Sequence, residues 1–200
     1  MHKLISAAAA ALFISACGGD VTDPHDHNEQ EVITIVRLTF TAGVDRTVAT
    51  FDDPDGDGGA APTIDGIALT ASSTYAVTVQ LENGLESPAE DITAEVREEA
   101  DEHQLFFTGD AVSGPATSNT DAILTHSYAD MDDDGLPIGL DNTIVAERAG
   151  TGSLTLTLRH LPSEDGVLKV ADLASTAASG GITALPGDSD VSVTFDVTVQ

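Results

Sequence analysis

The chain has 200 residues, of which 34 are Asp or Glu and seven are Lys or Arg, so its formal net charge is −27 at pH 7. Such a charge repels nucleic acid and anionic lipid headgroups and attracts divalent cations. The same acidity also suits a protein from a saline habitat. Aromatic residues make up 4% of the chain and Trp is absent, which argues against a sugar-binding module built on flat aromatic platforms.

Residues 1–16 are typical of an export signal. Lys3 supplies the positive start, and residues 4–16 form a short, alanine-rich apolar core that is too short to span a membrane. The segment ends in Ile14-Ser15-Ala16-Cys17, which resembles the lipobox of bacterial lipoproteins. The resemblance implies cleavage before Cys17 and acylation of that cysteine, which would anchor the protein to a membrane without spanning it. The alternative is a plain secreted protein in which Cys17 occurs by chance.

Removal of residues 1–16 takes away one basic residue, Lys3, and no acidic one. The mature chain therefore has six basic and 34 acidic residues and a net charge of −28. Cys17 is the only cysteine, which excludes an intramolecular disulfide and, if it is acylated, a thiol nucleophile. Residues 17–31 are polar and acidic, so we expect a flexible tether. Its His25 and His27 form an H-x-H pair that either grips a metal loosely or is simply solvated.

Residues 32–200 are enough for one domain. Alternation of apolar and polar residues predicts strands over residues 32–41, 46–52, 64–69, 74–81, 105–107, 122–128, 143–148, 153–160 and 191–199. The loop after the second strand carries acids at alternate positions before glycine and is either a second metal site or an ordinary acidic turn. Its candidate ligands are Asp53, Asp55 and Asp57.

One clear helix is expected between residues 87 and 103. Ser87-Pro88-Ala89-Glu90 has the form of a capping box with proline at the first helical position, and Ile92, Val96 and Ala100 make a narrow apolar stripe. A second, short helix is a weaker expectation near residues 170–178. The elements together predict a mainly β fold: a single antiparallel β-sandwich, Ig-like or jelly-roll-like, with about eight or nine strands and one helix.

The acidic run over residues 130–141 has the spacing of a calcium-binding loop. Carboxylates occupy loop positions 1, 3, 5 and 12, glycine occupies position 6, and the carbonyl at position 7 is a further ligand. The ligands that this spacing assigns are Asp130, Asp132, Asp134, Asp141 and the Leu136 carbonyl. Because strands flank the loop, we expect a weak structural site and no EF-hand pair. A plain solvated turn is the alternative.

Three histidines lie within the predicted domain. His126 and His160 share strand faces with apolar residues, and His103 lies at the end of the predicted helix. If the sandwich brings them together, they form a Zn²⁺ or Cu²⁺ site; otherwise they are separate histidines satisfied by the core. No G-x-S-x-G, P-loop, G-x-G-x-x-G or H-E-x-x-H motif is present, so we expect no enzymatic activity.

The order of these segments resembles an uncharacterised family of small envelope lipoproteins of Gram-negative bacteria, some of which are labelled "type 1 periplasmic binding fold superfamily protein". The resemblance rests on the lipobox, the acidic tether, the Phe-Asp-Asp-Pro-Asp-Gly turn, the Asp-Ile-Thr-Ala-Glu helix, the Asp-rich loop and the closing Val-Thr-Phe-Asp-Val-Thr-Val strand. It implies no established activity and no catalytic residues. The fold that the label names alternates βαβ units, whereas the pattern here has no such alternation.

The sequence therefore predicts a lipid-anchored protein of the cell envelope, placed at the outer membrane, with a calcium-stabilised sandwich. Its expected role is structural or binding, towards another envelope protein or a small ligand and not towards nucleic acid. The alternative is a periplasmic accessory protein that binds a transition metal through its histidines.

Overall fold

The computed structural model describes residues 31–162 and 166–200. The predicted signal peptide, Cys17, His25 and His27 lie outside these residues, so the lipid anchor and the tether stay predictions. Within the described residues no helix is long and apolar enough to cross a membrane.

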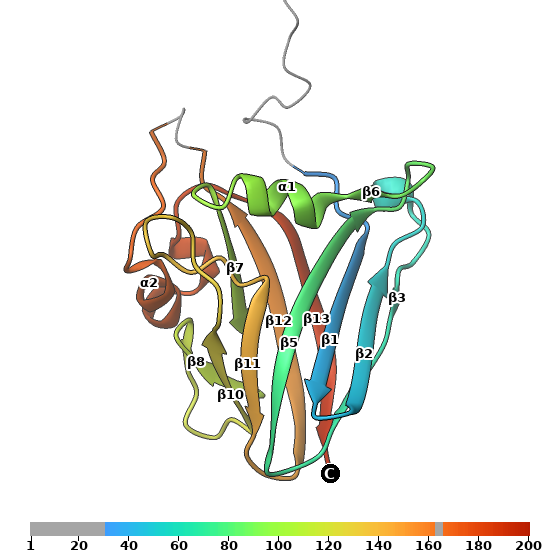
Figure 1. Ribbon diagram of the computed structural model, residues 1–200, viewed down its shortest axis with the longest axis vertical. Helices are drawn as coiled ribbons and strands as arrows, with labels where there is room; N and C mark the ends of the chain where they lie inside the picture. Colours follow the sequence, from blue (N-terminus) through green and yellow to red (C-terminus); the bar gives the residue numbers. More distant parts are fainter. Residues whose placement is uncertain (1–30, 163–165) are drawn as a thin grey trace, which may run out of the picture.

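Two β-sheets lie face to face and enclose one main core, as the alternating sequence predicts (Figure 1). The larger sheet has nine strands in the order β3-β2-β1-β5-β11-β10-β8-β9, with β6 paired to β5. These strands are β1 (Ile35–Ala42), β2 (Asp45–Asp52), β3 (Thr63–Ile64), β5 (Ser73–Asn83), β6 (Glu90–Asp91), β8 (Val112–Gly114), β9 (Thr117–Ser118), β10 (Leu124–Tyr128) and β11 (Asp141–Ala146).

The smaller sheet has the order β4-β13-β12-β7. Its strands are β4 (Ile67–Leu69), β7 (His103–Thr108), β12 (Gly150–His160) and β13 (Asp188–Val199). Inward-facing residues of both sheets, such as Leu38, Leu156 and Phe195, are fully buried because alternate side chains of a strand face the same side. The mainly β sandwich is thus confirmed. Two short parallel pairings, β8 with β10 and β4 with β13, depart from a wholly antiparallel arrangement.

The long predicted strands are all present within a few residues, and the additional strands are short. β8 and β9 lie between the strands predicted at residues 105–107 and 122–128, where no strand was predicted, and β3 and β4 divide the strand predicted at residues 64–69. Alternation is a weak signal over two or three residues, because so short a run cannot show a period.

The first helix is shorter than predicted. Glu90 and Asp91 pair with β5 as β6, so α1 (Ile92–Glu98) begins after them. Asp91 is the residue before the helix, and its side chain makes no capping hydrogen bond. The predicted capping box at residues 87–90 is therefore wrong: edge pairing to β5 takes the residues that would have formed the first turn. α1 lies across one end of the sandwich, and its buried Ile92 and Val96 close the core there (Figure 1).

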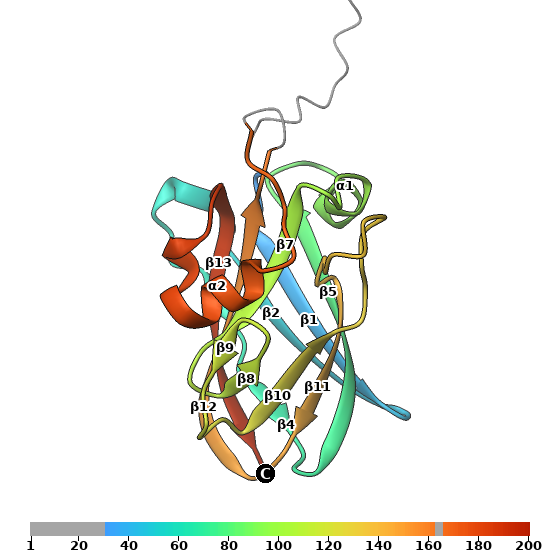
Figure 2. The ribbon, with the colours of Figure 1, turned by 90° about the vertical axis from the view of Figure 1, so that its left-hand side faces the viewer.

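The second helix, α2 (Leu173–Gly180), lies beside β9 on the side of the sandwich where β7 forms the edge of the smaller sheet (Figure 2). Leu173 and Ala177 pack with Phe106 of β7 in a second, smaller apolar cluster. Two 3-10 turns, η1 (Gly56–Gly58) and η3 (Ile182–Ala184), complete the described elements. Phe106 points away from the main core, so α2 gives this outward aromatic side chain an apolar environment.

Candidate metal centre

Two histidines face each other at the α1 end of the smaller sheet. His103 begins β7 and His160 ends β12, and the antiparallel register pairs them directly. Both continue the inward-facing rows of their strands, so both are buried, with 0% and 3% of their surface exposed. Their rings stack with centroids 4.6 Å apart and planes 14° from parallel.

Asp190 comes to the same place through a β-bulge. The register of β12 and β13 shifts between Leu158, which pairs with Val191, and Arg159, which pairs with Ser189. Asp190 is thus left without an opposite residue, and its side chain is 0% exposed beside His103. A bulge adds one residue to a strand and redirects side chains, so simple alternation fails at this point. Arg159 fixes the approach to the bulge by donating hydrogen bonds to Ser189 Oγ and to the backbone carbonyl oxygens of residues 185–187.

Glu31 completes the group from the segment that leads into the other sheet. It lies four residues before β1, and its side chain is 8% exposed and points to His103. The sequence placed Glu31 at the end of a solvated tether, and this assignment is wrong. The residues before Glu31 are polar and give no sign that it is buried. Its burial depends on contacts with residues that are distant in the sequence.

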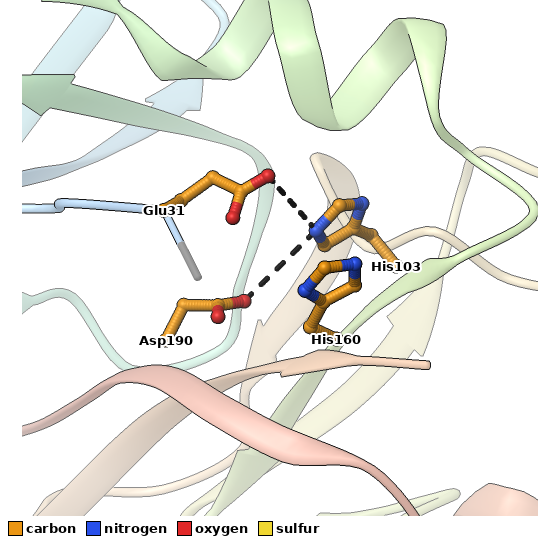
Figure 3. Close-up of side chains that lie close together, drawn as sticks. All are labelled: Glu31, His103, His160 and Asp190. Carbon is orange, nitrogen blue, oxygen red and sulfur yellow. Dashed lines mark ion pairs between the residues drawn. The ribbon is translucent and has the colours of Figure 1, made fainter. Parts of the chain in front are cut away.

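The four side chains converge on one point (Figure 3). One ligand atom from each of Glu31, His103, His160 and Asp190 lies within 4.8 Å of all the others. His103 Nε2 is 3.5 Å from Glu31 Oε1 and 3.9 Å from Asp190 Oδ2. Among the residues that the structure describes, this is the one group of three or more His, Cys, Asp or Glu that meets so closely.

The hydrogen bonding of His103 leaves the correct nitrogen free for a metal. Its Nδ1 lies 3.2 Å from the backbone carbonyl oxygen of Glu99, which can only accept, so Nδ1 carries the proton. Nε2 then has a lone pair directed at the two carboxylates and makes no hydrogen bond. A backbone carbonyl on the second ring nitrogen is the usual way in which proteins orient a metal-binding histidine. His160 Nε2 also makes no hydrogen bond, and it lies 3.9 Å from Glu102 Oε2.

Burial favours the uncharged forms of Glu31, Asp190 and His103. Desolvation, followed by the charge of Asp190, raises the pKa of Glu31 to about 8. Desolvation raises the pKa of Asp190 to about 7, although the Arg159 charge and the Glu31 backbone N–H act in the opposite direction. Desolvation, then the neighbouring His160, lowers the pKa of His103 to about 4. A divalent cation among these groups would favour two carboxylates and two neutral imidazoles instead.

The donor set suits a first-row divalent transition metal. Two imidazole nitrogens and two carboxylate oxygens are ligands for Zn²⁺ and its neighbours, whereas Ca²⁺ and Mg²⁺ prefer oxygen alone. Ligand atoms around a tetrahedral ion with bonds of about 2.1 Å lie roughly 3.4 Å apart. The two shortest described separations, 3.5 and 3.9 Å, are close to that value. Small inward movements of the four side chains would complete a coordination shell.

A surface hollow of about 420 Å³ adjoins the group on its carboxylate side. Glu31 and Asp190 line it together with apolar side chains that include Val32 and Leu85, both about half exposed. It gives a metal ion a route from solvent to the carboxylates.

His126 does not join the other histidines. Its Nε2 donates to Asn142 Oδ1 at 2.9 Å, and its ring stacks on Phe107 with centroids 4.3 Å apart. The structure thus brings His103 and His160 together and holds His126 apart from them, so His126 is excluded from a shared site and metal binding by the other two stays a prediction. Sequence reasoning missed Glu31 and Asp190.

In the acidic loop over residues 130–141, backbone N–H groups engage the carboxylates. The two oxygens of Asp130 accept the N–H groups of residues 139, 140 and 141 at 2.8–3.0 Å. Asp132 Oδ1 accepts the N–H groups of Asp134 and Leu136. The Leu136 carbonyl, expected to be a calcium ligand, accepts the N–H of Asp132 at 2.8 Å.

A lysine lies where the sequence assigned calcium. Lys169 Nζ is 2.7 Å from Asp132 Oδ2, and both side chains are only 2% exposed. Burial raises the pKa of Asp132, but its hydrogen bonds with Lys169 and with backbone N–H groups more than offset this, so the pKa lies below its usual value. Asp141 pairs loosely with Arg97 at 3.8 Å, and Asp134 is exposed. Calcium binding at this loop stays a prediction.

The second acidic loop, around η1, gathers no comparable group. Asp55 is exposed, and its Oδ2 accepts the N–H of Ala60. Asp53 is half-buried, and its backbone N–H donates to the Thr34 carbonyl. The side chain of Asp57 lies outside the described residues. Asp53 and Asp55 do not form part of any close group of metal-ligand side chains among the residues described.

Comparisons with protein-family models, with curated proteins and with solved structures gave no match. The resemblance to envelope lipoproteins therefore stays a prediction.

Calcium at residues 130–141 can be tested by thermal melting. If the loop binds Ca²⁺ with a Kd near 10⁻³ M, 10 mM Ca²⁺ should stabilise the protein by about 1.4 kcal/mol and raise the Tm by roughly 3–6 °C over its value in EDTA. Asp134→Asn is the matched control. The Asp134 side chain is exposed, so its only expected role is to bind the ion. The Tm in EDTA should therefore stay the same, and the increase in Tm that Ca²⁺ causes should vanish. An unchanged wild-type Tm excludes the site.

The metal-free protein should lose stability as the pH rises from about 6.5 to about 8. The folded-state pKa values of Glu31 and Asp190 lie above the ordinary 4.5 and 3.8, so their protonation stabilises the fold and this contribution is lost as pH rises through 7 and 8. The lowered pKa values of His103 and His126 act in the opposite direction, but only below pH 6.5. Urea denaturation in EDTA across this range measures the effect. Glu31→Gln should flatten the curve, and a wild-type stability that rises contradicts the assignment.

Proposed function

We propose that this chain is a lipid-anchored protein of the cell envelope whose sandwich domain binds one divalent transition-metal ion. The ligands are Glu31 Oε1, His103 Nε2, His160 Nε2 and one oxygen of Asp190. The observation that supports this most is the convergence of four ligand atoms within 4.8 Å in a buried place.

Three features favour a metal over a purely structural polar cluster. The Nε2 atoms of both histidines are buried without a hydrogen bond, although buried polar atoms are nearly always paired. The backbone carbonyl of Glu99 fixes the tautomer of His103 that leaves Nε2 unprotonated. The two carboxyls repel each other unless a proton or a cation lies between them. A structural cluster would instead be expected to satisfy its members among themselves.

The role that follows is metal binding in the envelope, as an accessory or storage protein. No catalytic step is assigned to the site. Two neutral imidazoles and two carboxylates balance the charge of one M²⁺ ion, so occupation of the site neutralises it. The relative affinities should follow the general order for nitrogen and oxygen ligands, with Mn²⁺ weakest and Cu²⁺ tightest. Calcium at residues 130–141 is a separate structural proposal.

The metal site can be tested by titration of Zn²⁺ into the metal-free protein. The wild type should bind one equivalent, and His103→Gln should weaken binding at least about 100-fold because one of the four ligands is lost. His126→Gln is the matched control: it changes a histidine that is equally buried but bonded to Asn142, and it should bind as the wild type does. Loss of binding in both variants, or in neither, contradicts the assignment.

The anchor can be tested independently of the metal. When the protein is expressed in a Gram-negative host, the wild type should partition into the detergent phase and carry acyl chains that mass spectrometry detects. Cys17→Ser should move to the aqueous phase, because the acyl chains hold the protein to the membrane. A wild-type protein that stays in the aqueous phase excludes the lipoprotein assignment and leaves the metal site unaffected.

A further inference from the structure

The four ligands differ in how firmly the fold holds them. His103, His160 and Asp190 stand on adjacent strands of one sheet, β7, β12 and β13. Ladder pairing fixes the spacing of the two histidines, and the bulge between the paired residues Ser189 and Val191 places Asp190. Glu31 belongs to neither sheet and precedes β1, a strand of the opposite sheet. Three ligands are thus in place before an ion binds, whereas the fourth depends on the course of residues 31–33.

The segment that carries Glu31 has few other attachments. The backbone bonds that tie the start of the described chain to the sandwich begin at Thr34, whose N–H donates to the Glu82 carbonyl and whose carbonyl accepts from the Asp53 N–H. Val32 is 52% exposed, and Ile33 is only partly buried against the core. Glu31 itself is held at the site, by its carboxylate beside His103 and its N–H towards Asp190.

Charge makes this attachment dependent on a cation. The carboxylates of Glu31 and Asp190 repel each other when both are ionised, and a divalent ion between them turns the repulsion into attraction. The hollow of about 420 Å³ lies on the same side and is lined by both Glu31 and Asp190, so an ion that arrives through it reaches the Asp190 carboxylate on the sheet as well as Glu31.

We infer that Glu31 is a closing ligand, so that the ion enters an open three-ligand site on one sheet and residues 31–33 then close over it. This inference rests on the proposed metal site and goes beyond it by assigning the site to reversible uptake and release. A site with all four ligands on rigid strands would instead hold its ion permanently, as a structural metal. Closure also attaches residues 31–33, which lead into β1 of the larger sheet, to the smaller sheet. Metal binding therefore changes the position of the chain at the N-terminal side of the domain.

A tryptophan reporter tests the closure directly, because the full chain contains no Trp. Val32→Trp places a single indole on the rim of the hollow. One equivalent of Zn²⁺, which has no unpaired electrons to quench fluorescence, should shift its emission to the blue and raise its anisotropy. Val44→Trp is the control: Val44 is 99% exposed in the β1–β2 turn, and its reporter should not respond.

Release kinetics supply the second measurement. In stopped-flow transfer of Zn²⁺ to a chromogenic chelator, Glu31→Gln should still bind the ion but release it at least about tenfold faster than the wild type. The fluorescence response of the Val32→Trp reporter should be lost when Glu31→Gln is added to it. His103→Gln should bind Zn²⁺ at least about 100-fold more weakly than the wild type, as in the titration.

The inference is overturned if Zn²⁺ binds stoichiometrically without changing the Val32→Trp signal, or if Glu31→Gln weakens binding as much as His103→Gln does. If the wild type binds no Zn²⁺, the titration overturns the proposed function itself.

Discussion

The burial of two carboxyls beside two imidazoles is the constraint on which the α1 end of this sandwich depends. Removal of charge from water is costly, and opposite charges or hydrogen bonds must compensate for it. Here Glu31 and Asp190 face the two imidazole rings and each other, and the Nε2 atoms of both rings have no hydrogen-bond partner. The arrangement is satisfied by protons on the carboxyls or by a cation among the four groups. The carboxyl protons are lost as the pH rises through neutrality, so only a cation can then compensate for the buried charges.

The sandwich produces this group by ordinary means. An antiparallel ladder places His103 opposite His160, so two residues 57 positions apart in sequence share one inward face. A bulge turns Asp190 towards them, and Arg159 holds the preceding loop by its backbone carbonyls. Glu31 arrives from the chain that leads into the opposite sheet. An ion bound here would therefore join both layers at the end where α1 closes the core.

The sequence predicted the parts of this structure that rest on local pattern. Strands with several alternating residues were located correctly, and His160 was placed on an apolar face because Leu154, Leu156 and Leu158 precede it at the same period. The site as a whole was beyond such reasoning. Asp190 would point outward by alternation, and only the bulge reverses it. Glu31 follows a polar stretch, and only contact with the smaller sheet buries it. The helix start was misplaced because pairing of β6 with β5 overrides the local capping pattern.

The two acidic regions show why ligand spacing alone is a poor guide to metal sites. The run over residues 130–141 has the stronger motif, yet backbone N–H groups satisfy Asp130, and Lys169, the single lysine after Lys3, lies against Asp132. An ion there must compete with donors already in place. The buried group has no motif, but the histidine nitrogens that face its centre make no hydrogen bond. Binding energy comes from satisfying groups that the protein leaves unsatisfied. The buried group is therefore the better candidate for a metal, although only the run over residues 130–141 has a recognisable sequence pattern.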